Sequence, residues 1–175
     1  MLPEASAGLL ALELGVRLPA DLAVEVVITG SGHVTVGNRT GRTFAETGRG
    51  DLRFERCRGP VRAKSGRGNV IAFDHCGDLD IHTVVGDMQA FVKEPGAVIR
   101  LVSGQGTVQC GVPATCEFDL DARAEVGRIG ADFDLAAETI GSYGAALVGK
   151  RGSARTKVVL RTGAGHLAFK VKTFD

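Results

Sequence analysis

Large aromatic residues are scarce in this sequence of 175 residues, which has no Trp and a single Tyr. Grooves that bind single-stranded nucleic acid stack the bases on aromatic side chains, so the composition argues against such a groove. No apolar run reaches the roughly 18 residues of a membrane-spanning helix. The first residues also lack the basic region and the cleavage site of a signal peptide. These absences leave a single domain without a large aromatic core as the expected class.

The sequence also lacks the residue patterns that metal binding and nucleophilic catalysis require. The four cysteines are Cys57, Cys76, Cys110 and Cys116, and the four histidines are His33, His75, His82 and His166. No CxxC pair occurs, and no histidine has the spacing of a metal ligand or of a catalytic triad. We expect buried free thiols, although Cys110 and Cys116 are near enough for a disulfide in an exported protein. The sequence therefore predicts no enzymatic activity, no required metal ion and no organic cofactor.

Glycine, by contrast, is abundant, with 25 residues, and much of it recurs at a fixed interval. The unit is seen most clearly in Lys64-Ser65-Gly66-Arg67-Gly68-Asn69-Val70. Its second glycine, which we call the anchor glycine, recurs at Gly32, Gly50, Gly68, Gly86, Gly106, Gly127 and Gly165. The first steps are 18 residues, later ones are 20 and 21, and the last is 38, or two coils of 19. A fixed period of this length predicts stacked structural units, here called coils.

Each coil has the same pattern of apolar residues around its anchor glycine. Apolar residues lie seven and five positions before the anchor, as in Val61 and Ala63, and two and four positions after it, as in Val70 and Ala72. A hydroxyl residue lies three positions before it, which predicts a ladder or a partner for corner amides. Further corners are expected at Gly41, Gly59, Gly77 and Gly96. The pattern predicts an all-β fold, a single-stranded parallel β-helix (β-solenoid) with coils of about 18–21 residues, right-handed by default.

The two ends and one internal segment depart from this pattern. Residues 1–9 are expected to be a tail or cap, and residues 10–175 a single domain. Alternating apolar residues predict a strand from Leu10 to Leu18, ended by Pro19. Residues 132–154 lack clean alternation and predict a looser coil or an excursion. Lys170 and Lys172 are expected on a terminal strand, where their charges would limit head-to-tail association of copies.

The chain resembles the bacterial family of adhesin-like β-strand repeats, a domain family of undefined function. The resemblance lies in Leu18-Pro19, in the strand and TGSG of Val24 to Gly32, and in the closing Leu160-Arg161-Thr162-Gly163-Ala164-Gly165-His166-Leu167. The serial copies between them match as well, so that residues 10–172 are covered. The resemblance implies a β-solenoid that is often exported or tethered to a membrane. It implies no catalytic residues.

Two acidic features raise the question of a site. The residues that follow the anchors are His33, Asp51, Asn69, Asp87, Thr107, Arg128 and His166. This column is interpreted as a solvated polar row, although its acidic part offers a place for one adventitious cation. Asp78 and Asp80 face outward from one strand, which leaves a polysaccharide-acting β-helix enzyme as the alternative function.

Positive charge is concentrated in one stretch of the chain. Nine basic residues lie between Arg39 and Arg67 against three acidic ones, in a chain of net charge +1. The expected site residues, on one face, are Arg49, Arg53, Arg62, Lys64 and Arg67. Such a face attracts an anionic polymer or surface. The expected function is a non-enzymatic structural or adhesin-like scaffold or binding module, with the ends available for association of copies.

Overall fold

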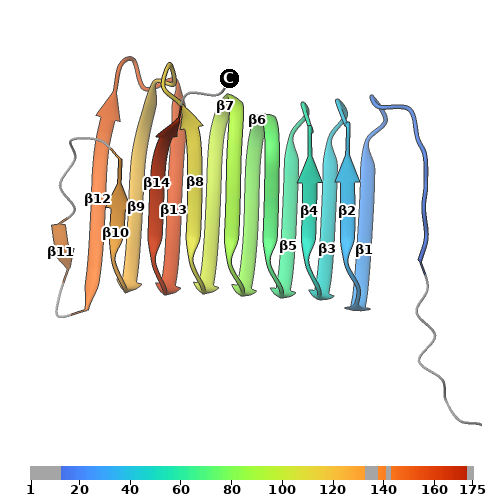
Figure 1. The fold of residues 1–175 in the computed structure, drawn as a ribbon, viewed down its shortest axis with the longest axis horizontal. Helices are drawn as coiled ribbons and strands as arrows, with labels where there is room; N and C mark the ends of the chain where they lie inside the picture. Colours follow the sequence, from blue (N-terminus) through green and yellow to red (C-terminus); the bar gives the residue numbers. More distant parts are fainter. Residues whose placement is uncertain (1–12, 133–137, 141–142, 173–175) are drawn as a thin grey trace, which may run out of the picture.

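The computed structural model describes residues 13–132, 138–140 and 143–172 (Figure 1). Its described residues form strands and turns without a helix, and one 14-stranded sheet joins the strands, mostly in parallel. The strands are β1 (Val24–Ser31), β2 (Val34–Gly37), β3 (Thr43–Arg49), β4 (Leu52–Glu55), β5 (Val61–Arg67), β6 (Val70–Val85), β7 (Met88–Gln105), β8 (Val108–Pro113), β9 (Phe118–Val126), β10 (Ile129–Ala131), β11 (Glu138–Ile140), β12 (Gly144–Arg151), β13 (Thr156–Ala164) and β14 (Leu167–Lys172). The predicted all-β class and parallel pairing are confirmed.

Successive coils stack in register, one strand of each coil in each of two layers. In the first layer Thr43 of β3 lies opposite Val61 of β5, which lies opposite Leu79 of β6. In the second layer β2, β4, β6, β7 and β8 pair in the same manner. β6 and β7 contribute to both layers because each continues through a corner.

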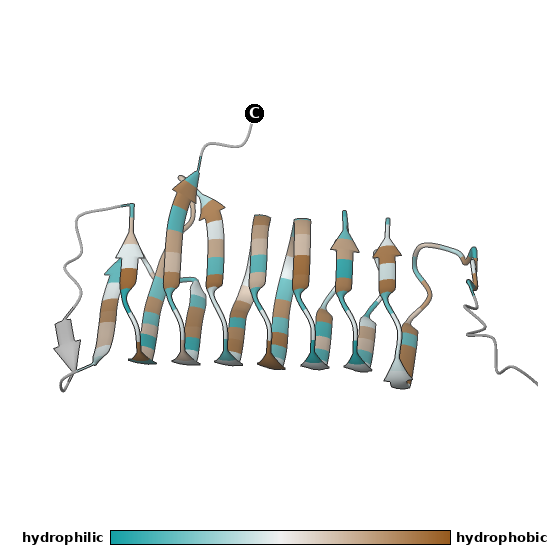
Figure 2. Cartoon of the chain, turned by 60° about the horizontal axis from the view of Figure 1, so that its bottom comes forward, coloured by the Kyte–Doolittle hydropathy of each residue, from teal (hydrophilic) through white to brown (hydrophobic). Residues whose placement is uncertain are grey.

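The core lies between the two layers and is built from the inward side chains that the apolar pattern predicts. Val61, Leu79 and Ile99 stand one above another in consecutive coils, each at most 2% exposed. Across the core, Phe54 and Ala72 stack in the second layer and are equally buried. Figure 2 shows the result as alternating apolar and polar bands along the strands. This alternation places the remaining side chains on the outer surfaces.

The anchor glycines form the corner between the two layers, and from Gly50 onward their positive φ and close backbone neighbours exclude a residue with a Cβ. Gly68 has a φ of +146°, and a Cβ atom on it would lie 2.1 Å from the carbonyl oxygen of Gly50 one coil earlier. The buried hydroxyl column donates to these same carbonyls: Ser65 Oγ to Gly50 at 3.3 Å and Thr83 Oγ1 to Gly68 at 3.4 Å. The hydroxyl ladder therefore satisfies carbonyls that face the core at the corner.

The polar column after the anchors is a second ladder on the outside of the same corner. Asp51 Oδ1 accepts the backbone N–H of Asn69 at 2.8 Å, and Asn69 Oδ1 accepts that of Asp87 at 3.0 Å. Asp87 Oδ1 then accepts the N–H of Thr107 at 2.7 Å. These oxygens cap backbone amides of the next coil, a role that the sequence interpretation of a solvated row did not include.

Near the C-terminus the spatial order of the coils differs from their order in the sequence. β13 lies between β7 and β9, and β14 lies between β8 and β10 (Figure 1). Beyond β9 the chain adds β12 antiparallel to it, and β11 antiparallel to β12. The irregular segment is thus an excursion with antiparallel strands. Lys170 and Lys172 lie on the last strand of the sequence, β14, as expected, but the expected position at an end of the stack is wrong, because β14 belongs to an inserted coil that pairs with β8.

The predicted strand before Pro19 is wrong for its described part, residues 13–18, which have no strand partner. Leu14 and Val16 are 80% and 63% exposed. Arg39 accounts for this arrangement, because its buried guanidinium donates to the carbonyls of Leu18 and Leu22. Residues 18–22 are thereby fixed on a corner, and the segment before them leaves the stack. The expected tail at residues 1–9 lies outside the described residues.

Candidate functional site

The five basic residues expected on one face lie on three different surfaces. Arg62 and Lys64 project from β5 in the first layer, and Arg53 projects from β4 in the second layer. Arg49 and Arg67 lie at the anchor corner, each directly before an anchor glycine. The alternation of side chains along strands explains the separation, because residues in the two layers point to opposite sides of the molecule.

Arg49 and Arg67 lie side by side, as the spacing of the coils predicts. They are direct partners in the β3–β5 register and are both exposed. Parallel neighbouring strands are about 4.8 Å apart, so the two side chains leave the backbone at that spacing. Neither side chain makes an ion pair within the described part of the chain. Two adjacent guanidinium groups without a counterion are an arrangement that a carboxylate, sulfate or phosphate group stabilises.

Lys64 and Arg62 extend the positive charge along β5. Lys64 is exposed and lies between Glu46 and His82 in the register. Arg62 Nε lies 3.3 Å from Asp80 Oδ2, so its charge is partly neutralised. Because this pair is exposed to solvent, it holds the guanidinium only weakly.

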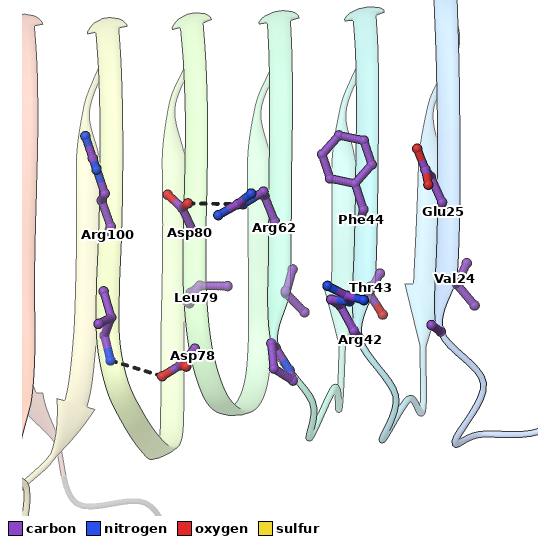
Figure 3. Close-up of a pocket in the computed structure, with 14 residues that line it drawn as sticks. Val24, Glu25, Arg42, Thr43, Phe44, Arg62, Asp78, Leu79, Asp80 and Arg100 are labelled. Atoms are coloured by element: carbon purple, nitrogen blue, oxygen red, sulfur yellow. Dashed lines mark hydrogen bonds and ion pairs between the residues drawn. The ribbon is translucent and has the colours of Figure 1, made fainter.

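A shallow groove crosses this first-layer surface, and it contains cations that the sequence interpretation missed (Figure 3). Arg42 and Arg100 line it together with Arg62. Glu25 and Phe44 stand in the same outward row as Arg62. The row follows from the register, so aligning the coils at the position six residues before the anchor would have found Arg100. Arg42 lies next to a corner, where the coil pattern gives no such signal.

Arg53 takes part in a separate arrangement on the second layer. It forms an ion pair with Glu55 and stands over the ring of Phe73, 5.9 Å from its centroid. Phe73 stacks on Phe91 at 5.3 Å, and Lys172 covers the other side at 4.3 Å from the Phe91 centroid. This row of two cations and two rings extends from the second coil, through the third and fourth, to the inserted coil. Its contacts indicate a structural role for Arg53.

The carboxylates of the alternative, enzymatic interpretation occupy two separate places. Asp51 and Asp87 belong to the corner ladder, whereas Asp78 and Asp80 line the groove. Asp78 Oδ1 accepts the backbone N–H of Val98 at 3.0 Å, and Asp80 contacts both Arg62 and His82. Each carboxylate thus has a partner of its own, and the four do not converge.

Burial disfavours the charged forms of three thiols and of one buried histidine. All four cysteines are buried and free. Burial raises the pKa of Cys57 and Cys116, and it raises the pKa of Cys110 to about 12. Burial likewise lowers the pKa of His75, against the hydrogen bond from its ring to the carbonyl of Asp78. Thiols of this kind are poor nucleophiles at neutral pH, because the thiolate is the reactive form.

Within residues 13–132, 138–140 and 143–172, no three His, Cys, Asp or Glu side chains are grouped so that they would hold a metal ion. No helix in the same part of the chain is long and apolar enough to cross a membrane. Comparison of the chain with protein-family models, curated proteins and solved structures found no match.

Proposed function

We propose that this chain is a right-handed β-solenoid of the adhesin-like type, and that it is a non-enzymatic module that binds an anionic polymer or surface. The observation that carries the proposal is the pair of exposed guanidinium groups of Arg49 and Arg67, adjacent in the register and without an ion-pair partner among the residues that the structure describes. Lys64 adds a charge on the same coil as Arg67. Right-handed crossovers are the default for parallel strands joined by a connection.

The rigidity of the corner supports this assignment. Each arginine precedes an anchor glycine, Gly50 or Gly68, where a Cβ atom would lie 2.1 Å from a backbone oxygen of the preceding coil, so the two coils are closely packed there. The arginines therefore start from fixed positions, and binding an anion does not require ordering of the backbone. Because guanidinium groups bind carboxylate, sulfate and phosphate in bidentate geometry, the ligand class is set by charge and spacing. A polysaccharide-acting enzyme is the weaker proposal, since Asp78 and Asp80 are already engaged.

The test measures binding of heparin, single-stranded DNA and anionic vesicles at about 50 and 200 mM salt. If about four cations contact the polymer, affinity for single-stranded DNA falls roughly 50-fold over this range. Replacing Arg49→Glu and Arg67→Glu together should weaken binding and reduce the slope of log affinity against log salt by about two. The control is Arg128→Glu with Arg151→Glu, an identical charge change at two exposed residues of β9–β10 and β12.

Three results would contradict the proposal. The first is an absence of binding to every probe at 50 mM salt. The second is binding that is indifferent to the double change at Arg49 and Arg67. The third is an equal loss in the control, which would show a dependence on net charge and not on the corner.

A further inference from the structure

The end of the molecule at β1 and β2 has an unpaired strand edge. Among the described residues β1 pairs only with β3, and β2 only with β4. The N–H of Val24 donates to the carbonyl of Arg42 at 2.8 Å, toward the stack. The backbone N–H and C=O groups of successive residues point to opposite sides of a strand. Those of Glu25 and Val27 therefore point away from β3, to the side of β1 that has no neighbouring strand. The natural partner of such a row is another strand.

The opposite end is closed in a different manner. There the antiparallel strand β12 covers the free edge of β9, and β11 follows on β12. A second copy therefore has no free parallel strand of β9 on which to place β1. Head-to-tail stacking, the arrangement expected from the sequence, would place β1 against the antiparallel strands β12 and β11 and not against a coil of its own kind.

The strands at the β1 end carry few of the charges that normally protect an edge, although β1 has a register shift between Ile28 and Ser31 and β2 is only four residues long. β1 and β2 contain one charged residue between them, Glu25, and no proline or lysine. Half of the exposed large apolar residues of the described chain lie at this end: Leu14, Val16, Leu18, Leu22 and Val27. Its backbone groups and its apolar surface both fit a protein strand.

We propose that two copies associate head to head through this end, with their β1 strands antiparallel about a two-fold axis at Val27. In this register Val27 meets Val27 of the second copy, Val26 meets Ile28, and Glu25 meets Thr29. Inward side chains then face inward side chains, and no two charges lie directly opposite. A register shifted by one residue would place the inward-facing apolar side chains of one copy beside outward-facing side chains of the other. Burial of the apolar side chains therefore selects the proposed register. The contact is closed, which limits the assembly to a dimer.

The first test uses a cysteine at the axis. In the proposed register Val27 is a hydrogen-bonded pair with itself, with a Cα separation of about 5.5 Å, inside the range of a disulfide. We expect Val27→Cys to form a disulfide-linked dimer under mild oxidation, because the four native thiols are buried. Val126→Cys is the matched control, since the two valines are 52% and 53% exposed. Equal crosslinking of both variants, or none at position 27, overturns the proposal.

The second test measures the mass of the full chain by sedimentation across a range of concentrations. A dimer is expected, and Val27→Lys should weaken it roughly tenfold or more by placing like charges together. Val148→Lys, on the opposite end in β12, should leave it unchanged. A monomer at all concentrations, a polymer, or a dimer sensitive to Val148→Lys contradicts the head-to-head arrangement. Neither test involves the basic corner, so their failure would leave the proposed anion binding standing.

Discussion

The anchor glycine Gly68 offers the sharpest test of how the coils are held together. Its φ of +146° lies in a region that residues with a Cβ rarely adopt. In Gly68→Ala the new methyl carbon would lie 2.1 Å from the backbone oxygen of Gly50. Since the obstacle is backbone, no change of side-chain rotamer relieves the contact. The two coils must separate at the corner, by roughly 1 Å to reach even a tight contact of about 3 Å.

The expected cost can be assembled from the groups that this separation disturbs. The backbone strain at such a φ costs about 1–3 kcal/mol. The hydrogen bond from Ser65 Oγ to the Gly50 carbonyl, 3.3 Å long, is weakened, as is the backbone bond from the N–H of Gly50 to the carbonyl of Arg67 at 2.8 Å. Each hydrogen bond contributes about 1 kcal/mol. We therefore expect Gly68→Ala to lower the free energy of unfolding by about 3–5 kcal/mol.

Urea unfolding of three matched Gly→Ala variants measures this quantity. At Gly30 a Cβ meets nothing within 4 Å, and at Gly48 it would lie 2.8 Å from the Gly30 carbonyl at an unstrained φ. Gly30→Ala should be neutral or stabilising by up to about 1 kcal/mol, because alanine restricts the unfolded chain. Gly48→Ala should fall between it and Gly68→Ala. The reasoning is refuted if Gly68→Ala costs no more than Gly30→Ala, with an unchanged dependence on urea.

Two further predictions concern buried titratable groups. Because burial lowers the pKa of His75 in the folded protein, the unfolded chain binds its proton more readily. The stability should therefore be fully present above about pH 6.5 and fall below it, by at most about 1.4 kcal/mol per pH unit for this group. Urea midpoints between pH 5 and 7.5 check this, and a slope unchanged in His75→Asn would contradict it. Burial raises the pKa of Cys110 to about 12, so its thiol should not react with a disulfide reagent at pH 8 until the protein unfolds. Rapid reaction of Cys110 in the native protein would contradict this prediction, because it would show that reagent reaches the core.

Much of the fold was determined by the sequence alone. The anchor glycines and the apolar residues at fixed distances from them predict both the parallel pairing and the inward side chains, such as Leu79 and Ile81. The reason is that each position is constrained locally. An inward residue must be apolar to enter the core, and a corner with a close backbone neighbour accepts only glycine. The adjacency of Arg49 and Arg67 follows from the same 18-residue spacing.

The order of the coils in space was decided only by the tertiary structure. Val158 and Leu160 of β13 lie opposite Ile99 and Leu101 on one side and opposite β9 on the other. All coils present similar apolar columns and the same backbone edges, so the sequence does not distinguish neighbours along the chain from neighbours in the stack. The 38 residues between the last two anchors signalled an irregularity without giving its geometry.

The distribution of the basic residues among three surfaces was likewise a tertiary result. Arg53 and Arg62 are only nine residues apart in the sequence, yet they lie on different layers because the chain turns a corner between them. Arg62 and Arg100 share the groove although 38 residues separate them. A run of basic residues is defined by positions along the sequence. A binding surface depends on which strands lie side by side, and the hydrogen bonds between coils decide that.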